Sequence, residues 1–204
     1  MASSEVAICN QALGWLGGTL ITSLTDDSDE AKLCNANYAS LRDAVLEERE
    51  WTFAVERITP ARLAAAPEYG FAYQFEIPPS VIRVLQVSQK GATANLTAEA
   101  YSTGLGTYDA IEWVREGSTI RCDAEEIYAR VIQQVTDTTK FSPAFDQALA
   151  ARIAMDLAIP LTESRTLQRD MAAMYGEKIN LAAASDGMQG RSQKTRSTSL
   201  ISVR

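Results

Sequence analysis

The chain has 204 residues and is acidic, with 26 Asp and Glu against 19 Lys and Arg, and it contains no histidine. This charge disfavours general nucleic-acid binding, and the lack of histidine removes the commonest general base and metal ligand. The sparse cysteines Cys9, Cys34 and Cys122 indicate neither a disulfide framework nor a zinc site, so we expect no cofactor and no metal. No apolar run reaches the length of a membrane span, and no signal peptide is evident, so we expect no membrane partner.

The first predicted element is a helix over residues 4–17. Apolar residues recur there at alternating steps of three and four, which places them on one face of a helix. Gly17 and Gly18 follow and favour a helix end, because glycine readily adopts a positive φ. The expected buried stripe consists of Val6, Cys9, Leu13 and Leu16.

A second helix is predicted to begin in the acidic run 26–30 and to continue to about Glu50. Asp27 and Glu30 have the spacing of a capping box, which favours a helix start over a calcium loop. We expect this helix to pack antiparallel to the first, across a short connection. Its expected buried stripe consists of Ala31, Cys34, Tyr38, Leu41 and Val45.

The middle of the chain favours strands. An extended region is expected from Trp51, and four prolines between 55 and 80 disfavour long helices. Val81 to Val87 is rich in β-branched residues and predicts a strand, and 126–135 predicts another. Residues 111–115 and 118–122 flank Glu116-Gly117, which indicates a two-residue hairpin.

Helical patterns return after residue 140. Ser142-Pro143 predicts an N-cap followed by proline in the first turn, and the helix that follows is apolar almost all round. Pro160 is expected to end this helix. A last helix is predicted over 164–185, with Leu167, Met171, Met174 and Leu181 facing inward.

These patterns together predict an α+β fold. We expect residues 1–55 and 140–186 to form an antiparallel helical bundle, and residues 56–139 to form a β-rich insert. Residues 187–204, the C-terminal tail, are rich in Gly, Ser and Thr and are expected to be extended. The tail carries a charge of +4, which leaves −11 on the rest of the chain, whose total is −7.

Catalytic patterns are weak throughout the sequence. Gly104-Leu105-Gly106 is too short to cradle a phosphate. Neighbouring carboxylates such as Glu47 with Glu48 do not face each other on a helix, so they indicate a solvated surface. We therefore expect a protein that is not an enzyme.

Several segments together resemble a bacteriophage family. Residues 10–17, Asn-Gln-Ala-Leu-Gly-Trp-Leu-Gly, are followed by Ile-Thr-Ser-Leu at 21–24 and by Trp-Thr-Phe-Ala at 51–54. These segments are similar to the start of the tail tubular protein A, or head-to-tail adaptor, of short-tailed phages. A second region of similarity contains Val135-Thr136-Asp137, Phe145, Ala148-Leu149-Ala150 and Ile159-Pro160-Leu161-Thr162. The resemblance covers roughly the two terminal thirds, and none of its motifs is catalytic.

The resemblance implies a structural virion protein at the head–tail junction, assembled in the host cytoplasm. It implies a ring of twelve copies that joins the portal protein to a downstream tail protein and lets viral DNA pass without sequence-specific binding. The C-terminal tail would dock on the portal through a basic and an aliphatic set of residues, namely Arg191, Lys194, Arg196, Leu200, Ile201 and Val203.

Without the resemblance, a disordered terminus is the favoured interpretation of the tail. Two alternatives of other classes also stay open, a tail-associated enzyme that degrades cell walls and a small helical DNA-packaging or regulatory protein. The second would need a basic helix face, and none of the four predicted helices has one.

Overall fold

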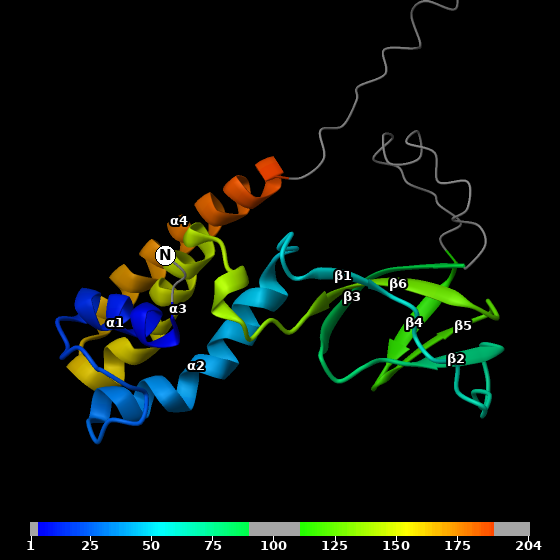
Figure 1. The fold of residues 1–204 in the computed structure, drawn as a ribbon, viewed down its shortest axis with the longest axis horizontal. Helices are drawn as coiled ribbons and strands as arrows, with labels where there is room; N and C mark the ends of the chain where they lie inside the picture. The colour runs from blue at the N-terminus through cyan, green and yellow to red at the C-terminus, as the bar shows by residue number, and fades with distance from the viewer. Residues whose placement is uncertain (1–3, 90–110, 190–204) are drawn as a thin grey trace, which may run out of the picture. The chain divides into compact units, whose positions relative to one another are not determined.

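The computed structural model describes residues 4–89 and 111–189, and it is a mixed helix-and-sheet structure, as the predicted α+β class requires (Figure 1). The described chain divides into two compact units. Unit 1 contains residues 4–55 and 134–189 and all four described α-helices, and unit 2 contains residues 56–89 and 111–133. Residue 134 belongs to unit 1, and its side chain donates to the Asp43 carboxylate of that unit over 2.6 Å.

Helix α1 extends over Glu5–Leu16, close to the predicted range. The Ser4 hydroxyl caps it by accepting from the Ala7 N–H, and Gly17 ends it with a φ of 73°. Of the expected stripe, Cys9, Leu13 and Leu16 are buried, together with Ile8 and Ala12. Val6 is only half-buried, so the inward face is rotated toward Ile8.

Helix α2 extends over Asp29–Glu48, and every residue of its predicted stripe is buried. The predicted capping box is wrong: Ser28 is the N-cap, and its hydroxyl accepts from the Ala31 N–H over 3.2 Å. Asp27 instead pairs with Lys32, while Asp26 accepts from the backbone of Thr22 and Ser23. The acids therefore shape the loop that precedes the helix.

Helix α3 extends over Pro143–Thr162, after a short 3₁₀ turn η2 at Thr138–Lys140. The predicted Ser142 cap is confirmed by its bond from the Phe145 N–H. Pro160 does not end the helix, contrary to the prediction, but lies inside its last turn. A proline there removes only one helical hydrogen bond, and Glu163, with a φ of 52°, ends the helix three residues later.

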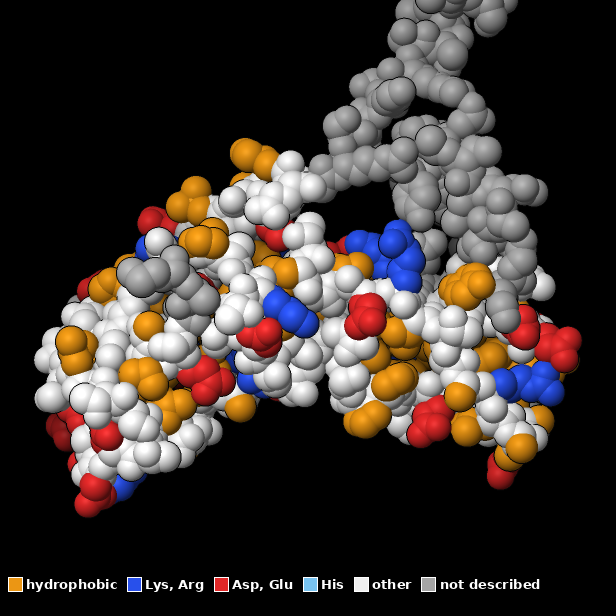
Figure 2. Space-filling model, viewed as in Figure 1, with side chains coloured by type: hydrophobic (Ala, Val, Ile, Leu, Met, Phe, Trp, Pro, Cys, Tyr) orange, Lys and Arg blue, Asp and Glu red, His pale blue; other side chains and the backbone are white. Residues whose placement is uncertain are grey.

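Helix α4 extends over Arg165–Gln189, so residues 187–189 of the predicted tail are helical. Its inward face carries Tyr175, Ile179, Ala182 and Asp186. The prediction that Leu181 faces inward is wrong, because one residue from Ala182 is a rotation of about 100° on a helix. Figure 2 shows hydrophobic side chains along the edge of unit 1 that α4 forms.

The buried helix α3 holds the other helices of unit 1 together. Helix α1 packs mainly on α3 and only slightly on α2, so the expected α1–α2 pairing is a minor contact. The aromatic rings of Trp51, Phe53 and Phe141 gather around Phe145, whose ring centroid lies 5.0 Å from that of Trp51. Such edge-to-face contacts stabilise the start of α3.

Unit 2 contains two antiparallel three-stranded sheets. The first has the order β1-β6-β3 and pairs β3 with β6 through two register shifts. The second has the order β2-β5-β4. The strands are β1 (Val55–Ile58), β2 (Tyr73–Glu76), β3 (Val81–Gln89), β4 (Trp113–Glu116), β5 (Thr119–Cys122) and β6 (Ile127–Gln133).

The predicted strands and hairpin occur, with shifted ends. Glu116 pairs with Thr119, so the hairpin loop is Gly117-Ser118 and not Glu116-Gly117. Gly117 has a φ of 58°, which glycine adopts at little cost. Strand β2 was not predicted, because its short polar and aromatic run follows a proline-rich stretch.

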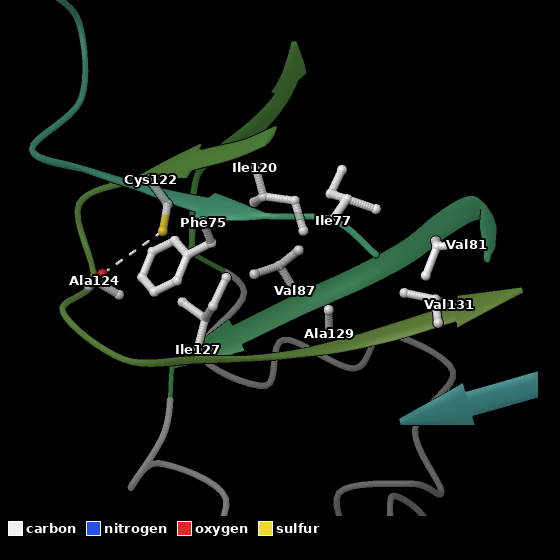
Figure 3. Close-up of a cluster of buried hydrophobic side chains, with 10 residues drawn as sticks. All are labelled: Phe75, Ile77, Val81, Val87, Ile120, Cys122, Ala124, Ile127, Ala129 and Val131. Carbon is white, nitrogen blue, oxygen red and sulfur yellow. Dashed lines mark hydrogen bonds between the residues drawn. The ribbon is translucent and has the colours of Figure 1, made fainter. Parts of the chain in front are cut away.

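The core of unit 2 lies between its two sheets. Figure 3 shows Phe75, Ile120, Val87 and Ile127, from four different strands, pointing toward one another. All four are almost completely buried. The Cys122 thiol lies at the edge of this core and donates to the Ala124 carbonyl oxygen over 3.8 Å.

The position of Pro160 inside α3 generates a stability prediction. We expect Pro160→Ala to raise the free energy of unfolding by about 1 kcal/mol, because alanine restores a helical N–H without a steric conflict. Pro143→Ala is the matched control, and it should not stabilise, because proline suits the first turn. Urea unfolding measures both variants, and a destabilised Pro160→Ala protein would contradict the expectation.

The loop before α2 generates a pH prediction. Hydrogen bonds from the backbone of Ser23 and Thr22 hold the pKa of the Asp26 carboxyl below its usual 3.8. A lowered pKa means that this stabilisation is present above the unfolded value and is lost as the pH falls through the folded value. The stability difference between wild type and Asp26→Ala should therefore shrink as the pH falls below 3.8 and through the lowered pKa of Asp26. Asp27→Ala is the control, and it should have little effect on stability at neutral or at acidic pH. A stability difference between wild type and Asp26→Ala that does not change with pH would refute the prediction.

Candidate functional site

The six residues predicted to dock on the portal lie at positions 191–203, outside the described residues. The nearest described segment is the end of α4 at Gln189. Polar contacts join this part of α4 to the end of α2 and to the residues that follow it, and Lys178 of α4 donates to Gln147 of α3, all within unit 1. This region, the α2–α4 junction, is the candidate site from which the tail emerges.

The first part of the junction is a network around Glu48. The Tyr175 hydroxyl donates to Glu48 Oε2 over 2.8 Å, and Arg152 Nη1 lies 3.6 Å from Glu48 Oε1. Arg152 also contacts Asp156 over 3.3 Å, and its guanidinium lies 5.5 Å from the centre of the Tyr175 ring. The network therefore joins side chains from α2, α3 and α4.

The chemistry of this network is that of a structural contact. Burial raises the pKa of Tyr175 well above its usual range, and the hydrogen bond to Glu48 adds a smaller contribution in the same direction. The phenol therefore stays protonated at physiological pH and acts as a hydrogen-bond donor. Glu48 accepts from it, and the Arg152 guanidinium lies beside the same carboxylate.

The second part is a pairing between Thr52 and Asp186. Asp186 is only 5% exposed, and its two carboxylate oxygens accept from the Thr52 N–H over 2.8 Å and from the Thr52 hydroxyl over 2.7 Å. A buried carboxylate is stable only when its oxygens are hydrogen-bonded. This pairing fixes the rotation of the end of α4 relative to the chain that follows α2.

A separate polar contact lies earlier in α2, outside the α2–α4 junction, where Arg42 is 5% exposed. Arg42 contacts the carboxylate of Asp43 over 2.9 Å through both Nε and Nη2, and Asp43 also accepts from Gln134. The charge of the buried guanidinium is therefore compensated locally. The contact connects α2 to the segment that leads into η2 and α3.

The cysteines have the environment of core residues. Cys9, Cys34 and Cys122 are all free and buried. A hydrogen bond with Cys34 raises the pKa of the Cys9 thiol far above its usual range, and burial adds a smaller contribution in the same direction. Burial likewise raises the pKa of Cys122. The Cys9 and Cys122 thiols therefore stay protonated and are poor nucleophiles, whereas the hydrogen bond with Cys9 lowers the pKa of Cys34.

An open depression of about 590 Å³ in unit 2 is lined by Arg62, Gln89, Glu125 and Glu126. Arg62 there is paired with Glu125 over 3.0 Å and lies over the Tyr73 ring. Across residues 4–89 and 111–189, no three acidic, cysteine or histidine side chains gather as a metal site would require. In the same ranges, no helix is long and apolar enough to cross a bilayer.

Comparisons with known proteins add no relative. No protein-family model matches the chain, and no curated protein is similar to it.

The pairs of the α2–α4 junction were not predicted from the sequence. Thr52 and Asp186 are 134 residues apart, and Glu48 and Tyr175 are 127 apart. The one available signal was a polar residue at position 186 in the same helical register as Ile179 and Ala182. This register places Asp186 on the inward face of the helix, where a carboxylate requires hydrogen-bond donors.

The Thr52–Asp186 pair generates a stability prediction. We expect Asp186→Ala to lower the free energy of unfolding by about 2 kcal/mol, because it leaves a backbone N–H and a hydroxyl without their acceptor. Asp170→Ala is the matched control on an exposed position of the same helix, with an expected change within about 0.5 kcal/mol. Chemical denaturation measures both, and equal effects of the two substitutions would refute a specific role for Asp186.

Proposed function

We propose that this protein is a head-to-tail adaptor of a bacteriophage, a structural virion protein that forms a ring between the portal and the tail. The proposal rests on the resemblance of its terminal thirds to the tail tubular protein A family. It assigns the protein to assembly and not to catalysis.

One observation from the structure supports the proposal: the resembling segments meet in unit 1. The Asn10 side chain donates to the Ile21 carbonyl and accepts from the Ile21 N–H, both over 2.8 Å, so the first two segments form one pair. Trp51 packs on Phe145, which joins the third segment to the C-terminal region of similarity. Segments far apart in the sequence therefore build one scaffold.

These residues have structural tasks within that scaffold. Trp51 is almost completely buried, and its indole N–H donates to the Val45 carbonyl over 2.9 Å. Asn10 fixes the loop that follows α1. Buried and hydrogen-bonded residues of this kind maintain a fold, so the resemblance supports a shared architecture. The proposed assembly role depends instead on residues at the surface of the protein.

In the proposed particle, twelve copies form the ring. The helices of unit 1 pack as an antiparallel bundle and form its wall, while unit 2 contacts the downstream tail protein. The extended basic tail docks on the portal through Arg191, Lys194 and Arg196 and through the aliphatic Leu200, Ile201 and Val203. Viral DNA passes through the ring without sequence-specific binding, since acidic walls repel phosphates and cationic walls would hold them.

Mixing experiments with purified portal protein test this function. Alone, the chain should be a monomer or a weak associate, because its net charge of −7 opposes self-association. With portal, light scattering should show a complex of ring size. Removal of residues 190–204 should leave thermal stability nearly unchanged and weaken portal binding by about tenfold or more.

Two tail variants separate the kinds of contact. Serine at Leu200, Ile201 and Val203 should speed dissociation, because apolar anchors act mainly on that rate. Glutamine at Arg191, Lys194 and Arg196 should slow association and reduce its dependence on salt. An unchanged mass on mixing with portal at several salt concentrations would refute the adaptor proposal.

A further inference from the structure

The outer face of the last turns of α4 is apolar and exposed. Leu181 is 69% exposed and Met188 is 85% exposed, the highest value among the large hydrophobic side chains of the described residues. The two are seven residues apart, which is about two helical turns, so they lie on the same face. Ala184 lies between them and is also exposed. We call these three residues the α4 stripe.

This face also lacks charge. Between Ile179 and Gln189 the only charged residue is Asp186, which is buried against Thr52. The solvent face of a surface helix normally carries charged side chains. The last three turns of α4 thus have the composition of a covered face, although nothing among the described residues covers Leu181 and Met188.

The α4 stripe lies beside an acidic region. The end of α2 contains Glu47, Glu48 and Glu50 together with the single cation Arg49, and Glu48 is paired with Arg152 of α3, so the region keeps a net negative charge. It is held next to α4 by the Tyr175–Glu48 bond and by the Arg49–Asn180 bond of 3.1 Å. Neither α2 nor α4 has a basic residue in its last turn, although the carbonyl ends of helices favour cations. A segment that covers the stripe should therefore be both aliphatic and basic.

A second copy of the α4 stripe fits this surface poorly. A stable interface buries about 800 Å² on each partner, far more than two exposed side chains and an alanine supply. Two copies would also bring two acidic α2 ends and two uncapped helix ends together, and like charges repel.

We infer that residues 191–204 of the same chain fold back along the outer face of α4. In this arrangement the aliphatic Leu200, Ile201 and Val203 cover Leu181 and Met188. The basic residues of the segment face the acidic end of α2 and the carbonyl end of α4. The segment has the required composition, since it has a charge of +4, contains no acid and carries three aliphatic residues near position 200.

The length of the segment permits this contact. Leu181 and Met188 are separated by about 10 Å along the helix axis. After a reversal of about four residues, the ten remaining residues to position 204 span about 33 Å in an extended conformation, which is more than enough. The contact is intramolecular, so a weak interaction suffices to hold it.

The contact has a consequence that rests on the proposed function. A tail held on its own α4 must leave it to dock on the portal, and its departure uncovers the α4 stripe. The stripe is then exposed only where a portal has bound the tail.

Oxidation of Met188 tests the inference directly. Hydrogen peroxide converts an accessible methionine thioether to the sulfoxide, and mass spectrometry follows the rate at Met188. In the full chain without portal, this rate should be roughly threefold to tenfold slower than in the chain that ends at Gln189. Serine at Leu200, Ile201 and Val203 should raise the rate to that of the truncated chain, and so should Leu181→Gln.

Two control variants accompany the measurement. Alanine at Ser199 and Ser202 keeps the aliphatic residues of the segment, so protection of Met188 should persist. Leu20→Gln removes a leucine that is 62% exposed and lies outside α4, so it should leave the oxidation rate of Met188 unchanged. Equal oxidation in the full and truncated chains would overturn the inference. Protection that disappears on dilution would also overturn it, because it would show that another copy supplies the tail.

The outcome is independent of the portal measurement. Protected Met188 in a chain that never binds portal would support the intramolecular contact and refute the adaptor proposal. Equal oxidation, combined with portal binding that is lost on truncation, would refute the contact and support the adaptor.

Discussion

Unit 1 depends on the burial of α3. Phe145, Leu149, Ile153 and Leu157 are almost completely shielded from solvent, and each such side chain contributes about 1.5–3 kcal/mol on burial. A helix that is apolar almost all round must be covered on all sides, and α1, α2 and α4 supply that cover. This requirement explains why α1 packs mainly on α3 and not on α2, its neighbour in sequence.

Polar contacts then decide how the covering helices are rotated. Asp186 must find partners inside the protein, and Thr52 supplies them with its N–H and its hydroxyl. Tyr175 meets Glu48 and Arg152 on the same side of α4. Once these residues face inward, Leu181 and Met188 necessarily face outward. The exposed apolar stripe of α4 is thus a consequence of the buried carboxylate.

The residues that resemble the phage adaptor family contribute to this scaffold and to its loops, as Asn10 with Ile21 and Trp51 with Phe145 show. The proposed assembly role therefore depends on what surrounds the scaffold. The end of α4 is central to that role, because an acidic region, an apolar face and the start of a basic segment come together there.

The sequence by itself determined the mixed helix-and-sheet class, the positions of the four helices, the Ser142 cap and the buried stripe of α2. These features are local, since caps and periodic apolar residues act within a few turns. Only the tertiary structure decided that Pro160 lies inside α3 and that Leu181 faces outward. Both depend on contacts that a local pattern does not contain: the cover over α3, and the pairing of Asp186 with Thr52, 134 residues away.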